Sequence, residues 1–206
     1  MKIIDCGVSG SFSPPDVPEW EELGLSEEWL NVVKTLAPGT NPRMAQVDAI
    51  TTGDLLTNRR NLIISAPTNS GKSLIGHLFC LQAIKAGKRA VLLEPLRAIA
   101  QEKFEELSEL APELSKLLGM ELKVTISTGD YRLEEEMMSD PAPEVGEFLI
   151  ATPERFEAIL RNPENKEWLE AFGAICLDEA HLIAKPPRGA VMEGVLTTMM
   201  CLSMPP

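Results

Sequence analysis

The sequence predicts an α/β fold of three layers, in which a mostly parallel sheet carries helices on both faces. Short apolar segments alternate along the chain with longer segments of helical character, as in strand–helix–strand units. The first of these apolar segments runs into a small-residue loop that ends Gly71-Lys72-Ser73, and the last delivers two adjacent carboxylates, Asp178 and Glu179. Polar groups at these places suit an open parallel sheet, because its ligands bind beyond the carboxyl ends of the strands.

The expected elements follow in chain order. Strands are expected where apolar residues form short runs, at residues 61–65, 90–93, 123–127, 148–151 and 174–177. One helix should run from Gly71 to about Gly87, where glycine suits a helix end. Pro153 suits the first turn of another, because its missing N–H is not needed there. The further helices are expected at residues 98–110, 153–160 and 190–202.

The first forty residues differ from the rest. Three prolines before Trp20 interrupt any regular element, so we expect an extended arm there. A short helix should follow at residues 26–36, with Trp29 on its apolar side. We therefore expect an arm and short helix at residues 1–40 and one α/β domain at residues 41–206.

The small-residue loop predicts a phosphate-binding site. In such a loop the backbone N–H groups surround the phosphates, the Lys72 ammonium reaches the β- and γ-phosphate oxygens, and the Ser73 hydroxyl ligates Mg²⁺. The general signature has glycine at the place of Ala66 and often at that of Asn69, although Asn tolerates left-handed backbone better than most residues. A chance strand–turn–helix connection is the alternative. The predicted nucleotide-binding residues are Ala66, Pro67, Thr68, Asn69, Ser70, Gly71, Lys72 and Ser73.

The acidic pair predicts the hydrolytic part of the same chemistry. Asp178 would hold the Mg²⁺ ion through water, and Glu179 would polarise the water that attacks the γ-phosphate. This division suits phosphoryl transfer, in which protein groups position the nucleophile and spread charge. The alternative is an acidic helix cap, which occurs in many proteins. With Lys72, these two carboxylates are the predicted catalytic residues.

The two motifs together resemble motifs I and II of the superfamily 2 DEAD/DEAH-box helicases, in which alanine at the start of the loop is usual. They read SAPTNSGKS at residues 65–73 and LDEAH at residues 177–181. Between them, EPLRAIA at residues 94–100 is similar to motif Ia, and ATPERF at residues 151–156 is similar to motif Ib. Four motifs in this order leave little room for coincidence.

Two further stretches narrow the resemblance to the Ski-type branch, and most closely to the archaeal Hjm-type repair helicases. They are STGDY at residues 127–131 and RGAVME at residues 188–193. The resemblance implies a P-loop NTPase domain of RecA-like fold, with ATP and Mg²⁺ as cofactors and single-stranded DNA or RNA as partner. The 206 residues suffice for one such domain and not for the two that these helicases use. With the second RecA-like domain absent, we expect ATP binding with weak or absent unwinding.

The resemblance also implies roles for residues outside the two main motifs. Residues 41–46 are similar to the Pro-x-x-x-Gln form of the Q motif, so Gln46 would contact the adenine edge, with a helix-surface glutamine as the alternative. His181 would couple the nucleotide site to the strand-binding side, although a lone histidine there could also cap or pack. The resemblance also implies arginine contacts with the phosphates of a nucleic-acid strand, with a surface arginine that has no partner as the alternative. The implied nucleic-acid-binding residues are Arg97, Thr128, Thr152 and Arg155.

Composition predicts a soluble cytoplasmic protein with weak, salt-sensitive affinity for nucleic acid. Hydrophobic residues make up 44% and charged residues 24%, and no apolar run approaches the ~20 residues that span a bilayer. The formal charge of −12 opposes binding of phosphates, but much of the acid is clustered at residues 19–28 and 134–136, where it reads as solvated surface. The four cysteines are widely separated, which predicts buried free thiols.

Two other functions remain open at the level of sequence. The chain could be a P-loop small-molecule kinase or switch-type NTPase without a nucleic-acid partner, or a nucleotide-binding scaffold without turnover. A kinase would have no use for Arg97 or for residues 152–155, and a scaffold would keep its properties on Glu179→Gln because it orients no water. The direction of translocation and the oligomeric state leave no mark in this sequence.

Overall fold

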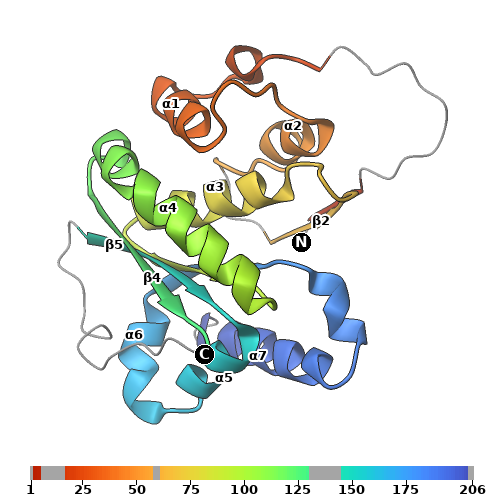
Figure 1. Ribbon diagram of the computed structural model, residues 1–206, viewed down its shortest axis with the longest axis vertical. Helices are drawn as coiled ribbons and strands as arrows, with labels where there is room; N and C mark the ends of the chain where they lie inside the picture. Colours follow the sequence, from red (N-terminus) through yellow and green to blue (C-terminus); the bar gives the residue numbers. More distant parts are fainter. Residues whose placement is uncertain (1, 6–16, 58–60, 130–144, 204–206) are drawn as a thin grey trace. The chain divides into compact units, whose positions relative to one another are not determined.

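The computed structural model describes residues 2–5, 17–57, 61–129 and 145–203. The chain divides into two compact units, residues 1–82 and 83–206, and each is described by itself (Figure 1). Within the described residues, no helix is both long and apolar enough to cross a membrane.

The first unit contains a two-stranded parallel sheet. Strand β1 (Lys2–Asp5) pairs with β2 (Leu62–Ser65), so that Ile3 lies opposite Ile63. The predicted strand at residues 61–65 is therefore confirmed, but among the described residues its partner is β1 and not the larger sheet. The expectation of an extended arm overlooked β1, whose two isoleucines favour a strand and whose backbone satisfies the hydrogen-bonding groups of β2.

Helices complete the first unit. The short helix predicted at residues 26–36 is α1 (Glu27–Leu36), and the Ser26 hydroxyl caps it by accepting from the Trp29 N–H. Its buried face includes Trp29, as expected. The 3₁₀ helix η1 (Trp20–Leu23) and helix α2 (Met44–Thr51) were not expected. Helix α3 (Lys72–Lys85) begins in this unit at the end of the phosphate loop, and its last residues belong to the second unit. Gly87 lies beyond the helix in left-handed backbone, as predicted for its end.

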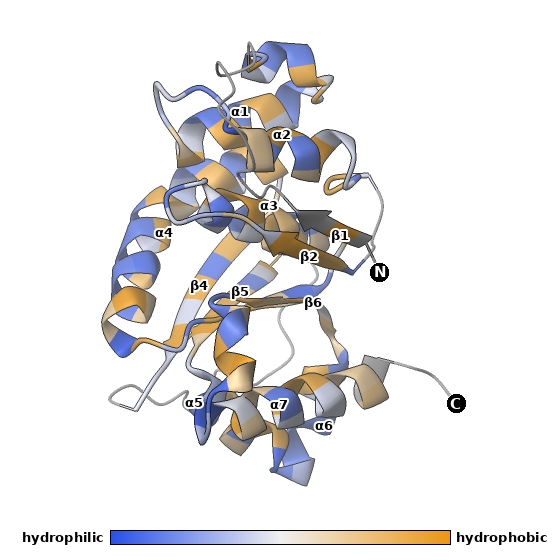
Figure 2. Cartoon of the chain, turned by 90° about the vertical axis from the view of Figure 1, so that its right-hand side faces the viewer, coloured by the Kyte–Doolittle hydropathy of each residue, from blue (hydrophilic) through white to orange (hydrophobic). Residues whose placement is uncertain are grey.

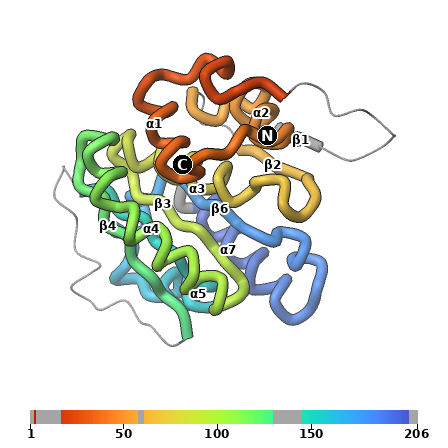
Figure 3. The backbone as a smooth tube through the Cα atoms, turned by 45° about the horizontal axis from the view of Figure 1, so that its top comes forward, coloured from red at the N-terminus to blue at the C-terminus, as the bar shows by residue number. Residues whose placement is uncertain are grey.

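The second unit is built on a four-stranded parallel sheet of order β4-β5-β3-β6. Its strands are β3 (Arg89–Leu93), β4 (Glu121–Ser127), β5 (Val145–Ala151) and β6 (Phe172–Leu177). All four predicted strands are present and end at the predicted residues, although each begins earlier than expected. Strands β3 and β6 are far apart in sequence yet lie side by side (Figure 3).

Helices cover both faces of this sheet (Figures 1 and 2). Helix α4 (Arg97–Leu118) packs against β4 and β5. The opposite face carries the main core of the unit, in which Val91 and Leu149 of the sheet meet side chains of α5 (Pro153–Leu160) and α7 (Arg188–Ser203). The α/β class with a parallel sheet between helices is therefore confirmed. The connections also contain η3 (Pro163–Asn165), α6 (Lys166–Glu170) and η4 (Ala180–Ala184).

A buried ion pair closes the amino-terminal end of the sheet. The Arg89 Nε donates to Glu147 Oε2 at 2.8 Å, and both side chains are 3% exposed. The indole N–H of Trp168 donates to the same carboxylate oxygen at 3.3 Å, and the Arg89 guanidinium lies over its ring. A buried charge is tolerated when it is paired and hydrogen-bonded, and this group meets both conditions.

The cysteines differ from the prediction in part. Cys80 is buried and Cys176 is half-buried, but Cys201 is exposed on α7, and none of these three thiols forms a disulfide. Helix α7 presents one side to the core and the other to solvent, so neighbouring residues of its last turn differ sharply in burial. The thiol of Cys201 stands on the solvent side. Cys6 lies outside the described residues.

Candidate functional site

The phosphate loop connects β2 to α3 in the first unit. Asn69 and Gly71 have φ values of 63° and 82°, so both lie in the left-handed region. The expected tolerance of Asn69 for this backbone is confirmed. A Cβ at Gly71 would lie 2.0 Å from the Nε2 of Gln46, so the loop needs glycine there for reasons of space as well as backbone conformation.

Lys72 lies within hydrogen-bonding reach of its own loop. Its ammonium donates to the carbonyl oxygens of Ala66 and Pro67, each at 2.8 Å. The Ser73 residue is exposed, as are Thr68 and Asn69. The loop therefore presents an ammonium, a hydroxyl and a helix N-terminus together, which is the donor set that phosphate oxygens need.

Gln46 is buried against the phosphate loop rather than on a helix surface. It is 6% exposed, and helix α2 carries it. Its Nε2 donates to the Gly71 carbonyl at 3.1 Å, and its Oε1 accepts from the Arg43 N–H at 2.8 Å. These bonds hold the Gln46 side chain against the backbone of the phosphate loop. Each amide atom keeps further hydrogen-bonding capacity, and the adenine contact stays a prediction.

The acidic pair follows β6 in the second unit. The Asp178 N–H continues the strand pairing by donating to the Leu93 carbonyl at 3.0 Å. Its carboxylate is held on both sides, because Oδ1 accepts from the Glu179 N–H at 2.8 Å and Oδ2 accepts from the Lys103 ammonium at 2.7 Å. The same ammonium donates to Glu94 Oε2 at 2.8 Å. Sequence reasoning missed Lys103, since it lies 75 residues from Asp178 in the chain.

Two pKa values in this cluster depart from their ordinary range. Burial alone would lower the pKa of Lys103, but its hydrogen bonds to Asp178 and Glu94 outweigh burial and hold the pKa above the usual value. Lys103 is therefore a cation at neutral pH. Burial, followed by the charge of Asp178, raises the pKa of the Cys176 thiol to about 12, so this thiol is neutral.

Glu179 has an unusual backbone for a glutamate. Its φ of 51° and ψ of 39° place it in the left-handed region, where a residue with a Cβ is uncommon. Its carboxylate Oε2 lies 3.0 Å from the Nδ1 of His181, and both side chains are largely exposed. The predicted water-activating and coupling residues are thus in contact. Strained backbone of this kind clusters at functional sites, which agrees with a role in chemistry.

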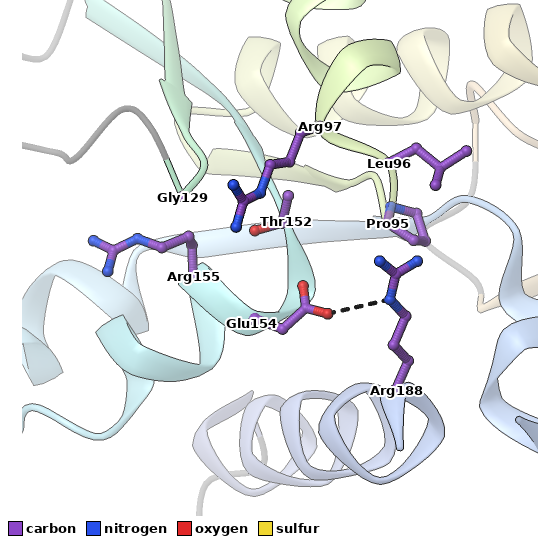
Figure 4. Close-up of a pocket in the computed structure, with 8 residues that line it drawn as sticks. All are labelled: Pro95, Leu96, Arg97, Gly129, Thr152, Glu154, Arg155 and Arg188. Carbon is purple, nitrogen blue, oxygen red and sulfur yellow. Dashed lines mark ion pairs between the residues drawn. The ribbon is translucent and has the colours of Figure 1, made fainter. Parts of the chain in front are cut away.

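A cavity of about 350 Å³ lies at the carboxyl end of the four-stranded sheet (Figure 4). It is lined by Arg97 from the start of α4, Thr152 directly after β5 and Arg155 from α5. These are three of the four residues predicted to contact nucleic acid. Thr128 does not line it, although Gly129 does, and the two threonines are similarly buried, at 2% exposed for Thr128 and 3% for Thr152. The lining residues are Pro95, Leu96, Arg97, Gly129, Thr152, Glu154, Arg155 and Arg188.

The cavity carries more positive than negative charge. Arg97 points toward Thr152 and Gly129, while Arg188 reaches up from α7 toward Glu154 (Figure 4). The Arg188 Nε lies 3.6 Å from Glu154 Oε1, so one carboxylate offsets one of three guanidinium groups. Sequence reasoning gave Arg188 no role, although it opens the RGAVME stretch. Asp130 and Tyr131 of the STGDY stretch lie outside the described residues.

A metal ion would need oxygen, nitrogen or sulfur ligands from the side chains. Within the described residues, no three or more His, Cys, Asp or Glu side chains form a cluster that could hold an ion. Magnesium, however, is usually bound through one or two carboxylates together with phosphate oxygens and water. The Asp178 carboxylate of the second unit and the Ser73 hydroxyl of the first are each an oxygen ligand of this kind, so each by itself suits a nucleotide-bound magnesium ion, and their role in binding one stays a prediction.

Comparison with known proteins identifies the family. The family model described as DEAD/DEAH box helicase matches residues 43–205, a range that includes every motif from Gln46 to Arg188. The chain belongs to the DEAD/DEAH box helicase family. This confirms the resemblance drawn from the phosphate loop and the acidic pair, and it favours a nucleic-acid helicase motor domain over a small-molecule kinase.

Individual helicases of this family are similar to most of the chain. ATP-dependent DNA helicase Hel308 of Pyrococcus horikoshii is 35% identical over 181 residues, which are 87% of this chain and 23% of that protein. Hel308 of Methanocella arvoryzae is 33% identical over 154 residues, 75% of this chain and 19% of that protein. These relatives confirm the narrower resemblance to archaeal Hjm-type helicases. The chain spans about a quarter or less of their length.

A solved structure of another helicase has a similar fold. Helicase Lhr of Mycobacterium smegmatis, bound to single-stranded DNA and AMP-PNP, superimposes with a TM-score of 0.67 at 26% identity. The match covers 87% of this chain and 23% of that protein. The RecA-like fold of the DEAD/DEAH helicase domain is therefore confirmed for this chain.

Proposed function

We propose that this chain is the ATP-binding motor domain of a DNA helicase, which couples ATP hydrolysis to movement along one strand when it works with a second RecA-like domain. The domain would comprise residues 41–206. The names of the relatives, which are ATP-dependent DNA helicases, support DNA over RNA as the substrate. A cytoplasmic location remains a prediction from composition.

The nucleotide would bind at the phosphate loop. Lys72 would leave the carbonyl oxygens of Ala66 and Pro67 for the β- and γ-phosphates, because a charged oxygen is the stronger acceptor. Ser73 and Asp178 would hold Mg²⁺, which neutralises charge on the phosphate oxygens when bound. Glu179 would orient the attacking water, and its contact with His181 gives the proposed coupling residue a direct hold on that carboxylate.

The single strand of DNA would bind at the cavity of the second unit. Phosphate groups are recognised by arginine, hydroxyl and helix N-terminal N–H donors, and the cavity combines Arg97, Arg155 and Thr152 at the start of α5. The proposal of a nucleic-acid site rests on the presence of these three residues in one cavity. Arg97 and Arg155 lie 58 residues apart in two separate motifs, and the sequence predicts each of them to contact nucleic acid. A small-molecule kinase gives no reason for them to meet.

The test is binding of a fluorescent single-stranded DNA oligonucleotide, measured by anisotropy over a series of salt concentrations. We expect Arg97→Ala and Arg155→Ala each to weaken binding and to lower the salt slope by about 1, the effect of losing one phosphate contact. Arg161→Ala is the matched control, because Arg161 is an exposed arginine of the same unit that pairs with Glu157 outside the cavity. Equal affinity and salt slope in the cavity variants and the control would refute the strand site.

A further inference from the structure

Lys103 is a buried cation that the proposed hydrolytic chemistry leaves without a role. It lies on α4 and is 7% exposed, although lysine is almost never fully buried unless it is paired. Its ammonium makes two short hydrogen bonds, at 2.8 Å to Glu94 and at 2.7 Å to Asp178. Both partners stand at the carboxyl ends of strands, one after β3 and one after β6.

The sheet itself forces these two carboxylates together. Leu93 and Leu177 are paired across β3 and β6, so Glu94 and Asp178 follow at the same level of neighbouring strands. Glu94 is 2% exposed, and like charges at close range in a poorly solvated site repel strongly. The Lys103 ammonium lies between them and offsets this repulsion. One ammonium group thereby ties Asp178 to the buried Glu94.

The same contact fixes how the Asp178 carboxylate is turned. Lys103 donates to Oδ2 and the Glu179 N–H donates to Oδ1, so neither oxygen can rotate without losing a bond. Each oxygen still has a second lone pair. The side chain of Asp178 is 20% exposed, whereas that of Lys103 is 9% exposed. The carboxylate thus reaches solvent while its cationic partner stays in the interior.

The buried pair Arg89–Glu147 offers a comparison within the same unit. It is also an enclosed ion pair, but it stands at the opposite end of the sheet, and its partners Trp168 and Thr125 belong to no predicted site. That group has the contacts of a purely structural pair. Lys103 differs because one of its two bonds ends on a residue with a predicted part in metal binding.

We propose that Lys103 is a positioning residue for Asp178, which holds this carboxylate correctly turned for the magnesium ion of the nucleotide. This rests on the proposed function, in which Asp178 takes part in binding Mg²⁺–ATP. Groups that orient a metal-binding carboxylate typically affect metal affinity by about 10- to 100-fold when removed. The effect should therefore appear in the magnesium dependence of nucleotide binding, and not in nucleotide affinity as such.

The experiment compares the Kd of a fluorescent ATP analogue in Mg²⁺ with its Kd in EDTA, using the 206-residue chain. Lys103→Met alone leaves Glu94 buried and unpaired and could unfold the protein. The deciding variant is therefore Lys103→Met with Glu94→Gln, which removes one charge of each sign. Lys103→Arg keeps the cation, and Lys116→Met is the control, because Lys116 is an exposed lysine on the same helix.

We expect the double variant to lose about tenfold of the enhancement by Mg²⁺ while its Kd in EDTA stays within about twofold of wild type. Lys103→Arg and Lys116→Met should keep the enhancement. A folded double variant with undiminished enhancement would overturn the inference, as would an equal loss in Lys103→Arg. If the wild-type chain itself shows no enhancement by Mg²⁺, the proposed function fails, and this inference falls with it.

Discussion

At the scale of single residues, Gly129 decides where the Arg97 guanidinium can lie. A Cβ on Gly129 would stand 2.3 Å from the Arg97 Cζ, so the two groups cannot keep their places together. The clash involves the far end of a flexible side chain, which can turn aside without disturbing the backbone. The strand site should therefore be more sensitive to this position than the fold.

We accordingly predict that Gly129→Ala weakens binding of single-stranded DNA and leaves the free energy of unfolding within about 0.5 kcal/mol of wild type, the usual range for surface substitutions. Anisotropy and chemical denaturation measure the two quantities on one preparation. Arg97→Ala with Gly129→Ala should bind no more weakly than Arg97→Ala alone, because both act on one guanidinium. Undiminished DNA affinity in Gly129→Ala would show that Arg97 need not lie there.

Residues of local motifs were predictable from sequence, and residues that act through distant partners were not. Lys72 and Asp178 are predictable because each belongs to a short motif that directly follows a strand. Lys103 and Arg89 carry no such local signal, since their acidic partners Asp178 and Glu147 lie 75 and 58 residues away. Only the pairing of β3 with β5 and β6 brings such residues into contact.

At the scale of elements, helix α4 shows burial overcoming a local signal. The sequence favours an end at residue 110, because Pro112 lacks an N–H and its ring opposes the preceding turn. The helix instead continues to Leu118, and its buried stripe includes Leu107, Ala111 and Leu114. These side chains lie on one face at helical spacing, and α4 packs against β4. The apolar burial gained outweighs the cost of the proline.

The balance within α4 can be measured by two substitutions. Leu114→Ala should lower the free energy of unfolding by about 2 to 5 kcal/mol, because it empties a fully buried site. Pro112→Ala should raise it, by up to about 3 kcal/mol, because alanine restores the hydrogen bond of an exposed helical position. Chemical denaturation measures both. A loss of stability in Pro112→Ala would mean that the proline fits this helix without strain.

The sequence predicted the carboxyl-terminal ends of the β-strands better than their amino-terminal ends. All four strands of the larger sheet end where expected, because polar groups of the candidate site begin there. Their amino-terminal ends extend further, through residues such as Glu147 and Arg89 that look unsuited to a strand. These two neutralise each other in the interior. Helix α7 has two unlike sides in the same way, since Met199 is buried in the core whereas its neighbour Met200 is 60% exposed.

At the scale of the whole molecule, net charge and local charge point in opposite directions. The chain carries a formal charge of −12, yet its cavity gathers three arginines and one glutamate. Exposed charges separated by more than about 10 Å are largely screened at 0.1 M salt, so the cavity can attract a strand despite the acidic surface elsewhere. The acidic remainder should still keep the affinity low, in line with the weak binding expected from sequence.

The central claim is that this chain binds ATP through the phosphate loop as a helicase motor domain does. The most direct test is the affinity of wild type and Lys72→Ala for a fluorescent ATP analogue in Mg²⁺, with Lys85→Ala as the control at the far end of the same helix α3. Saturable binding should fall by about tenfold or more in Lys72→Ala, because a hydrogen bond to a charged group contributes about 1.5 to 3 kcal/mol, and should persist in the control. Equal affinity in wild type and Lys72→Ala would contradict the claim.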